Sequence, residues 1–452
     1  MYTEINKIEI LKNKVINITD YFSIKVIDDE IYVFNSYNSN SFLYVKIRKD
    51  NIILTSDLIF ESSKSVDLHN TFKYINNVGI GATSIFNKEF EIIPHGYSLR
   101  IKDLKKIRIS GQTRYKSDPA NCLEEVLKKY IKNNRIAISF SGGLDSTSIL
   151  YACHRIFKDK EIVAFTWWNR GCSNNDLVES EEICNKLGIK LLKIEIEPND
   201  LIKDLNIKKH IIPNYPASYL AFIGFIEKYI KNLNTYFKSE DYCIINGTGG
   251  DQIFLEALPL KSVLNFNFLQ IKNFCDLNAI NYIDILKYIS SMKLKKINFN
   301  EKNYKEASIY ESLSLTSSKY LKNLECCFFY PFSTEEMINC SLNFEAGSTF
   351  DDKFYRNHFR KSLLNKYSSY DFYRIGKGSM TGAYQKSIKN NSDLLKKIII
   401  NGSLIKNNII NESDFISSFD LSAHGINGVH PKVLLPIIFE KCLISMSIYN
   451  DE

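Results

Sequence analysis

The chain has 452 residues, 44% of them hydrophobic and 24% charged, which is typical of a soluble globular protein with room for two or more domains. Lysine and arginine exceed aspartate and glutamate only by 58 to 51 and are spread along the chain, so a nucleic-acid partner is not expected. The absence of an 18-residue apolar run and the acidic start at Glu4 and Glu9 predict neither secretion nor membrane insertion. The ten cysteines form no Cys-x-x-Cys pair, which favours reduced thiols in the cytoplasm over a zinc site.

The first quarter of the chain is predicted to be rich in β-strands. Short β-prone stretches are separated by Asn, Ser and Gly turn signals, and they cover residues 30–34, 41–47 and 97–101. The chain changes character near residues 109–121. We therefore expect a smaller β-rich domain at residues 1–115 and a larger domain at residues 116–452.

In the larger region, predicted strands and helices alternate. Residues 163–167, 190–196 and 242–246 have the pattern of buried strands, and residues 177–187 that of the helix between the first two. This order predicts an α/β fold with a doubly wound parallel sheet, whose ligands lie beyond the carboxyl ends of the strands. Helical patterns dominate from about residue 262 onward. They are clearest at residues 266–292 and 431–449.

The most informative segment is residues 135–150, in which a buried strand leads into a glycine turn and then into a helix. Ser141, Gly142 and Gly143 let backbone N–H groups approach an anion, and the start of the helix adds its positive end. Ser146 can donate a hydroxyl from the first turn. The pattern Ser-Gly-Gly-x-Asp-Ser lacks the Gly-Lys-Ser/Thr ending of a Walker loop. It is similar to the pyrophosphatase-type (PP-loop) motif of enzymes that split ATP into AMP and pyrophosphate.

A second glycine turn, Gly-Thr-Gly-Gly-Asp at residues 247–251, follows the predicted strand 242–246. Taken alone, such a turn is as plausible for structure as for function. Its place about a hundred residues after the first loop favours function, because two strand ends of one parallel sheet can face a single nucleotide. Asp145 and Asp251 are then a plausible magnesium pair, since Mg²⁺ takes carboxylate and phosphate oxygens.

Together with Tyr-Pro-Phe at residues 330–332 and the late segment 372–379, the two loops resemble the asparagine-synthetase superfamily, and within it most closely the lasso peptide macrolactam synthetases. The similarity covers about residues 130–385. It implies ATP and Mg²⁺ as cofactors, with the metal on Asp145 and Asp251 and a reacting centre stabilised by Lys377. Residues implied in ATP and pyrophosphate binding are Ser141, Gly142, Gly143, Asp145, Ser146, Phe165, Thr166, Trp167, Gly249 and Gly250. The catalytic positions implied are Lys377, Asp251 and Thr248.

Two departures from the wider superfamily narrow the function. Glutamine-dependent asparagine synthetases begin with a cysteine nucleophile, whereas this chain has Tyr2 and no cysteine before Cys122. The first domain is therefore expected to be a degenerate glutamine-amidotransferase-like (Ntn-type) domain without glutaminase activity. Thr248 stands where asparagine synthetases carry a glutamate and β-lactam synthetases a tyrosine, and a threonine hydroxyl is not a useful base at neutral pH.

The resemblance implies an AMP-producing lasso peptide cyclase. Such an enzyme adenylates an Asp or Glu side chain of a leader-cleaved precursor peptide and then joins it to the peptide's N-terminal amine. It also implies a precursor core peptide as substrate, with a leader peptidase and a leader-binding protein as partners. Two alternatives stay open: an asparagine synthetase or β-lactam-type amide synthetase, and a non-catalytic ATP-binding scaffold of a peptide-maturation complex.

Some charged residues outside these motifs are interpreted as structural. His95, in Pro-His-Gly, is expected to mark a turn in the first domain. Two clusters of charged residues at helical spacing are expected to lie on the solvated surface. The second cluster is also a minor candidate for contact with a peptide. The clusters are the glutamates Glu179, Glu181 and Glu182, and the group Asp351, Asp352, Arg356 and Arg360.

Overall fold

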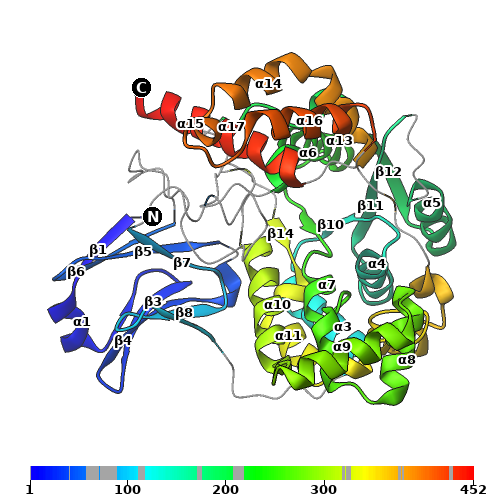
Figure 1. Ribbon diagram of the computed structural model, residues 1–452. Coiled ribbons are helices and arrows are strands. Elements are labelled where there is room, and N and C mark those ends of the chain that lie inside the picture. Colours follow the sequence, from blue (N-terminus) through cyan, green and yellow to red (C-terminus); the bar gives the residue numbers. More distant parts are fainter. Residues whose placement is uncertain are drawn as a thin grey trace.

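The computed structural model describes residues 2–39, 41–56, 71, 89–109, 118–170, 176–206, 218–317, 321, 327–374, 378, 381–426 and 431–451. Antiparallel sheets occupy the first part of the chain, and a parallel sheet with many helices follows (Figure 1). Within these residues, no helix combines the length and the apolar character that a membrane crossing requires.

Two antiparallel sheets form the N-terminal part. One has the strand order β1-β6-β5-β7, and the other the order β2-β3-β4-β8-β9. The strands are β1 (Tyr2–Asn6), β2 (Val15–Asn17), β3 (Phe22–Ile27), β4 (Glu30–Asn35), β5 (Leu43–Ile47), β6 (Asn51–Thr55), β7 (Phe90–Ile93), β8 (Tyr97–Arg100) and β9 (Lys105–Arg108), with helix α1 (Lys7–Asn13) after the first. Successive side chains of β5 point to opposite faces, so Leu43 and Val45 join one core while Tyr44 joins another. The predicted β-rich character of this region is confirmed.

The sheet that follows is parallel throughout, in the order β12-β11-β10-β13-β14. Its strands are β10 (Arg135–Ser139), β11 (Glu161–Trp168), β12 (Lys190–Glu195), β13 (Cys243–Ile245) and β14 (Cys327–Phe329). Ile136 and Ile138 pack in the core that includes residues of α3 and α4, and Ala137 packs in the core that includes residues of α6. Helices therefore cover both faces, as a doubly wound sheet requires. The chain order reverses between β10 and β13, which is where ligands of such sheets bind.

Helices make up most of the remaining structure. The α-helices are α3 (Pro119–Tyr130), α4 (Leu144–Ile156), α5 (Asp176–Leu187), α6 (Ile223–Phe237), α7 (Gly250–Ile253), α8 (Phe268–Asn278), α9 (Tyr282–Leu294), α10 (Glu301–Thr316), α11 (Glu335–Ser341), α12 (Asn357–Tyr367), α13 (Thr381–Asn390), α14 (Ser392–Ile400), α15 (Ser403–Lys406), α16 (Glu412–Ala423) and α17 (Pro431–Asp451). Short 3-10 helices are η1 (Tyr37–Ser39), η3 (Pro198–Asp200), η4 (Ser218–Phe222), η5 (Leu260–Asn265), η6 (Pro331–Ser333), η7 (Ala346–Ser348) and η8 (Tyr370–Tyr373). In Figure 1, α13 to α17 gather on one side of the parallel sheet and α8 to α11 lie at the other end of the molecule.

The helical pattern predicted over residues 266–292 is confirmed, but the structure divides it into α8 and α9, because the chain turns between them. Ala279 adopts the left-handed conformation, with φ 52°, and ends α8. Asn281 then starts α9, since its side chain accepts a hydrogen bond from the backbone N–H of Ile283 at 2.8 Å. The apolar periodicity continues across the break, so it did not reveal the turn.

His95 lies in a turn, as expected, but its ring is buried where the antiparallel sheets meet α10. The ring is 1% exposed, with Nδ1 2.8 Å from the carbonyl oxygen of Tyr37 and Nε2 2.8 Å from Oγ1 of Thr316. Burial lowers the pKa of this imidazole to about 4. The two parts of the chain therefore share a desolvated polar contact.

Candidate functional site

The two glycine loops predicted from the sequence meet at the point where the strand order of the parallel sheet reverses. The first follows β10 and the second follows β13, and these strands are neighbours in the sheet. Both loops border a cavity of about 750 Å³. Its other walls come from β11, η4 and α6, from α8 and α10, and from the segment before and within α12; they include Phe165, Trp167, Phe222, Phe225, Ile226, Tyr229, Leu277, Leu315, Lys353, Phe354, Tyr355, Arg356 and Arg360.

The first loop has the form of an anion site. Gly142 has φ +67°, and a Cβ atom there would lie 2.8 Å from Nη1 of Arg374, so both backbone angle and space favour glycine. Helix α4 starts after Gly143 without a side-chain cap, which leaves its first N–H groups available at the loop. Ser146 donates from Oγ to the carbonyl oxygen of Gly143 at 3.1 Å and accepts from the N–H of Ser141 at 3.3 Å. Ser141, Gly142, Gly143 and Ser146 therefore lie together beside the start of α4, and their role in binding phosphate stays a prediction.

The second loop packs directly onto Asp145. A Cβ atom at Gly250 would lie 2.2 Å from Oδ1 of that aspartate, and one at Gly247 would lie 2.9 Å from its Cβ. Gly249 has φ +102°, which lets the chain turn into α7. Thr248 borders the cavity and donates its hydroxyl to Oδ1 of Asn246 at 2.7 Å.

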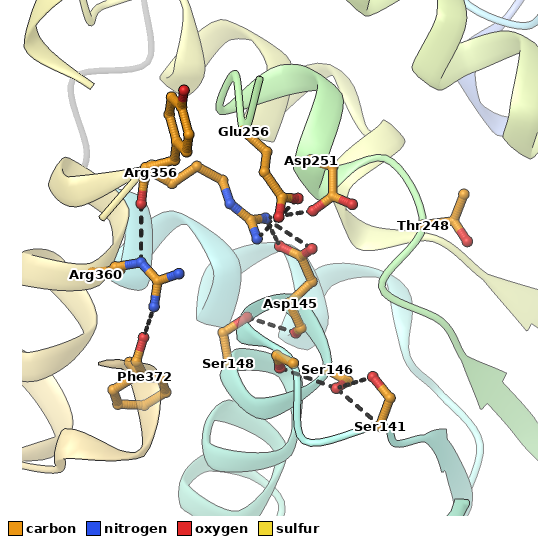
Figure 2. Close-up of polar contacts among 12 residues, drawn as sticks. Ser141, Asp145, Ser146, Ser148, Thr248, Asp251, Glu256, Arg356, Arg360 and Phe372 are labelled. Atoms are coloured by element: carbon orange, nitrogen blue, oxygen red, sulfur yellow. Dashed lines mark hydrogen bonds and ion pairs between the residues drawn. The ribbon is translucent and has the colours of Figure 1, made fainter. Parts of the chain in front are cut away.

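Asp145 and Asp251 come together as the sequence predicted, but an arginine lies between them (Figure 2). Nη1 of Arg356 is 2.8 and 2.9 Å from the two carboxylate oxygens of Asp145 and 2.9 Å from Oδ1 of Asp251. Its Nη2 is 3.4 Å from Oε2 of Glu256. The expectation that Arg356 forms surface ion pairs is wrong: the residue is 4% exposed. Its neighbour Asp351 instead accepts the backbone N–H groups of the following turn.

Arg360, assigned to the same surface cluster, also faces the cavity. Its Nε donates to the carbonyl oxygen of Tyr355 at 2.9 Å, and its Nη1 donates to the carbonyl oxygen of Phe372. Burial, and then the charge of Arg356, lower the pKa of this guanidinium to about 10. Arg360 therefore remains protonated at neutral pH and adds positive charge to the wall.

Two carboxyl groups of the site, Asp145 and Glu256, lie in an environment that disfavours their charge. Burial raises the pKa of Asp145 to about 6, with Arg356 opposing the shift and Asp251 adding to it. Burial, and then a hydrogen bond that the protonated Glu256 donates to Asp251, raise the pKa of Glu256 to about 7. Burial tends to lower the pKa of Arg356, but the surrounding carboxylates raise it on balance. The positive charge of Arg356 thus stabilises the negative charge of the surrounding carboxylates.

The predicted magnesium pair does not fit a metal ion in this arrangement. Asp145 and Asp251 supply the oxygen atoms that Mg²⁺ prefers, yet Arg356 Nη1 contacts both carboxylates at 2.8–2.9 Å. In the part of the chain that the structure describes, no group of three or more His, Cys, Asp or Glu side chains is arranged to hold a metal.

Three of the residues implied in ATP binding, Phe165, Thr166 and Trp167, lie on β11. Phe165 and Trp167 border the cavity, and the ring of Phe165 stacks on that of Tyr229 with centroids 5.0 Å apart. Thr166 points away from solvent and is 1% exposed. Apolar rings thus cover one wall of the cavity, opposite in character to the charged wall that carries Arg356.

Sequence reasoning missed the role of Arg374, which ties the first loop to α5. Its Nη1 donates to the carbonyl oxygen of Ser141 at 3.1 Å, and its Nη2 is 2.6 Å from Oδ1 of Asp176. Its Nε pairs with Glu179, so the expectation that this glutamate is merely solvated is wrong. The signal was present, because Arg374 belongs to the late segment 372–379 that carried the family resemblance. Lys377, from that same segment, lies outside the described residues.

Comparisons with known proteins match one part of the chain, which includes the first loop. The family model described as NAD synthase matches residues 117–217. A 7-cyano-7-deazaguanine synthase from Staphylococcus saprophyticus is 29% identical over 106 residues, which are 21% of this chain and 47% of that protein. The chain thus spans about half the length of this curated relative.

Two solved structures are also similar. An NH3-dependent NAD synthetase from Campylobacter jejuni has 10% identity and a TM-score of 0.25, covering 68% of this chain and 91% of its own. A U34-tRNA thiolase from Methanococcus maripaludis has 12% identity and a TM-score of 0.25, covering 69% and 80%. The sequence matches, together with the parallel sheet and its loop, support an NAD-synthase-like, PP-loop ATP-pyrophosphatase domain.

Proposed function

We propose that this protein is an ATP-dependent amide-forming ligase that activates a carboxylate by adenylation. The observation that carries the proposal is the meeting of the two glycine loops, with Asp145 and Asp251, at one end of a parallel sheet beside a 750 Å³ cavity. Such a position is where nucleotides bind in this class of sheet. The NAD synthase family model covers the first loop, which supports ATP as the nucleotide.

In the proposed reaction, the carboxylate attacks the α-phosphorus of ATP and pyrophosphate leaves. An amine then attacks the acyl carbon of the adenylate and loses a proton, and AMP departs with the electron pair of the broken C–O bond. The first loop would hold the pyrophosphate through its N–H groups and Ser146. Arg356 and Arg360 would stabilise negative charge that develops on the phosphates. We further propose Lys377 as a stabiliser of the reacting acyl-phosphate centre.

The finer proposal is a lasso peptide cyclase, which joins an Asp or Glu side chain of a peptide to its own N-terminal amine. The family resemblance of the loops and of segment 372–379 supports it. So does Thr248, which is hydrogen-bonded to Asn246 and unsuited to act as a base. An α-amine with a pKa of about 8 is on the order of one-tenth neutral at pH 7, so a strong base is dispensable. The cavity must then mainly order the peptide against water.

The same proposal includes the partners and the other domain. A leader peptidase and a leader-binding protein would prepare and deliver the core peptide. The β-rich region, proposed to span residues 1–115, would be the degenerate glutaminase-like domain that the family resemblance implies. Mg²⁺ is proposed to bind together with ATP. In the arrangement described above, Arg356 contacts the two carboxylates that would hold the ion.

A second candidate is an amide synthetase for a small molecule. The match of residues 117–217 to the NAD synthase model favours it, because that family is named for a small-molecule product. Thr248 counts against the asparagine-synthetase and β-lactam-synthetase versions of this chemistry.

Mass spectrometry separates these candidates. The protein is incubated with ATP, Mg²⁺ and a leader-free core peptide, alongside Asp145→Asn and Lys377→Ala. The matched control is Glu182→Gln, at an exposed position of α5. A cyclase removes one water from the peptide and releases AMP, both variants lose this activity, and the control keeps it. A peptide that stays linear with its peptidase present, while aspartate and ammonia yield asparagine and AMP, would refute the cyclase. Nucleotide binding without AMP formation from any substrate would support the scaffold.

A further inference from the structure

Arg356 is placed in the acidic cluster by a strained backbone. The residue lies in the left-handed region, with φ 58° and ψ 34°, directly before α12. A non-glycine residue is disfavoured there and persists when the surroundings over-determine it. Here Asn357 donates its N–H to the carbonyl oxygen of Thr349 at 2.6 Å, and the Tyr355 hydroxyl donates to Oδ1 of Asn278 at 2.6 Å. These contacts on either side direct the guanidinium inward.

The guanidinium uses the carboxylate oxygens that a metal ion would need. One nitrogen, Nη1, contacts both oxygens of Asp145 and Oδ1 of Asp251. A guanidinium does not lose its proton in proteins, so this positive charge is permanent. With a side chain only 5% exposed, Arg356 is poorly hydrated if a cation takes its partners. A metal ion arriving alone would therefore take two of the three carboxylates that contact this buried guanidinium and leave it only the longer contact to Glu256, which is unfavourable.

A nucleotide changes this balance, because its phosphates bring negative charge to the same cavity. Arg356 and the first loop both border that cavity. A triphosphate on the loop offers the guanidinium new partners and adds oxygen ligands for a cation. We infer that Arg356 is an internal counter-ion which keeps divalent cations off Asp145 and Asp251 until a nucleoside triphosphate enters. The inference rests on the proposed function, since it concerns how that site is loaded.

Arg360 provides a matched control on the same helix. Its guanidinium also faces the cavity, but the hydrogen bonds it makes go to the backbone carbonyls of Tyr355 and Phe372. Figure 2 shows the two arginines side by side, with Arg356 turned to the carboxylates and Arg360 turned to the carbonyls. Removing Arg360 deletes a half-buried positive charge at the same cavity and leaves the contacts between Arg356 and the acidic pair in place.

The test is Mn²⁺ binding to the full-length protein, followed by electron paramagnetic resonance, first without nucleotide. We expect the unaltered protein and Arg360→Met to bind no Mn²⁺ below about 1 mM. We expect Arg356→Met to bind at least about tenfold more tightly, through the released carboxylates. Combining Arg356→Met with Asp251→Asn in one protein should abolish this increase in Mn²⁺ affinity. Circular dichroism checks that each variant is folded.

Two results would overturn the inference. One is tight Mn²⁺ binding by the unaltered protein alone that Asp145→Asn removes, and this measurement stands even if Arg356→Met does not fold. The other is equal Mn²⁺ affinity of folded Arg356→Met and the unaltered protein.

The same measurement is repeated with the unhydrolysable analogue α,β-methylene-ATP. With the analogue bound, the unaltered protein should bind Mn²⁺, and a bound analogue without bound Mn²⁺ would refute the coupling between nucleotide and metal. If the analogue does not bind at all, the proposed function fails, while the comparison without nucleotide still decides whether Arg356 excludes cations.

Discussion

Acidification should destabilise this protein through the buried ring of His95. In the folded chain the pKa of His95 is about 4, against an ordinary value of 6.5, because burial disfavours the charged imidazolium. Between these two values the unfolded chain binds a proton that the folded chain does not. The free energy of unfolding therefore decreases as the pH falls from about 6.5 to about 4 and is unaffected by this group above that window.

The magnitude follows from the shift. The two pKa values differ by 2.5 units, and at about 1.36 kcal/mol per unit the loss below pH 4 approaches about 3 kcal/mol. The ring is 1% exposed, so solvent does not screen this contribution appreciably. A loss of this size is a large fraction of the stability of an ordinary domain. It acts at the contact between the antiparallel sheets and α10, where the ring meets Thr316.

The assay compares urea unfolding of the unaltered protein, His95→Gln and His424→Gln at several pH values between 7 and 4. Glutamine cannot titrate, so His95→Gln should show a shallower pH dependence than the unaltered protein, by about 3 kcal/mol over the window. His424 is exposed, and its replacement controls for the loss of an imidazole outside the buried contact. Carboxylates also titrate between pH 7 and 4, but they do so in all three proteins, so their contribution to the pH dependence cancels in the comparison. Parallel curves for His95→Gln and the unaltered protein would contradict the reasoning.

Three substitutions test other features. Gly250→Ala places a methyl 2.2 Å from Oδ1 of Asp145 and should lower ATP-dependent turnover by roughly 100-fold in a folded protein; normal turnover would show that this carboxylate need not be held in place. Arg374→Ala removes a cation that lies 2.6 Å from the buried Asp176 and should lower the free energy of unfolding by about 3–5 kcal/mol in urea, and a change below about 1 kcal/mol would mean that the pair is dispensable. Ala279→Gly relieves the left-handed residue between α8 and α9 and should raise thermal stability by roughly 0.5–1 kcal/mol, whereas a loss would indicate one continuous helix.

Local patterns in the sequence determined the elements that carry the loops. A buried strand, a glycine turn and a helix are neighbours along the chain, so residues 135–150 predicted β10, the anion loop and α4 without any long-range information. The alternation of strands and helices also determined the parallel sheet. Because parallel strands end at the same edge, the sequence further predicted that Asp145 and Asp251 lie together.

The tertiary structure alone decided what lies between and around those residues. Arg356 is 211 residues from Asp145, and its helical spacing to Arg360 is the same as that of a surface pair, so nothing local distinguishes it. His95 belongs to a polar turn by sequence and becomes buried only when α10, more than 200 residues away, packs against it. Local order follows from backbone preference and periodicity, which neighbouring residues carry. Burial and charge pairing depend on which distant surfaces meet, and only the folded chain determines that.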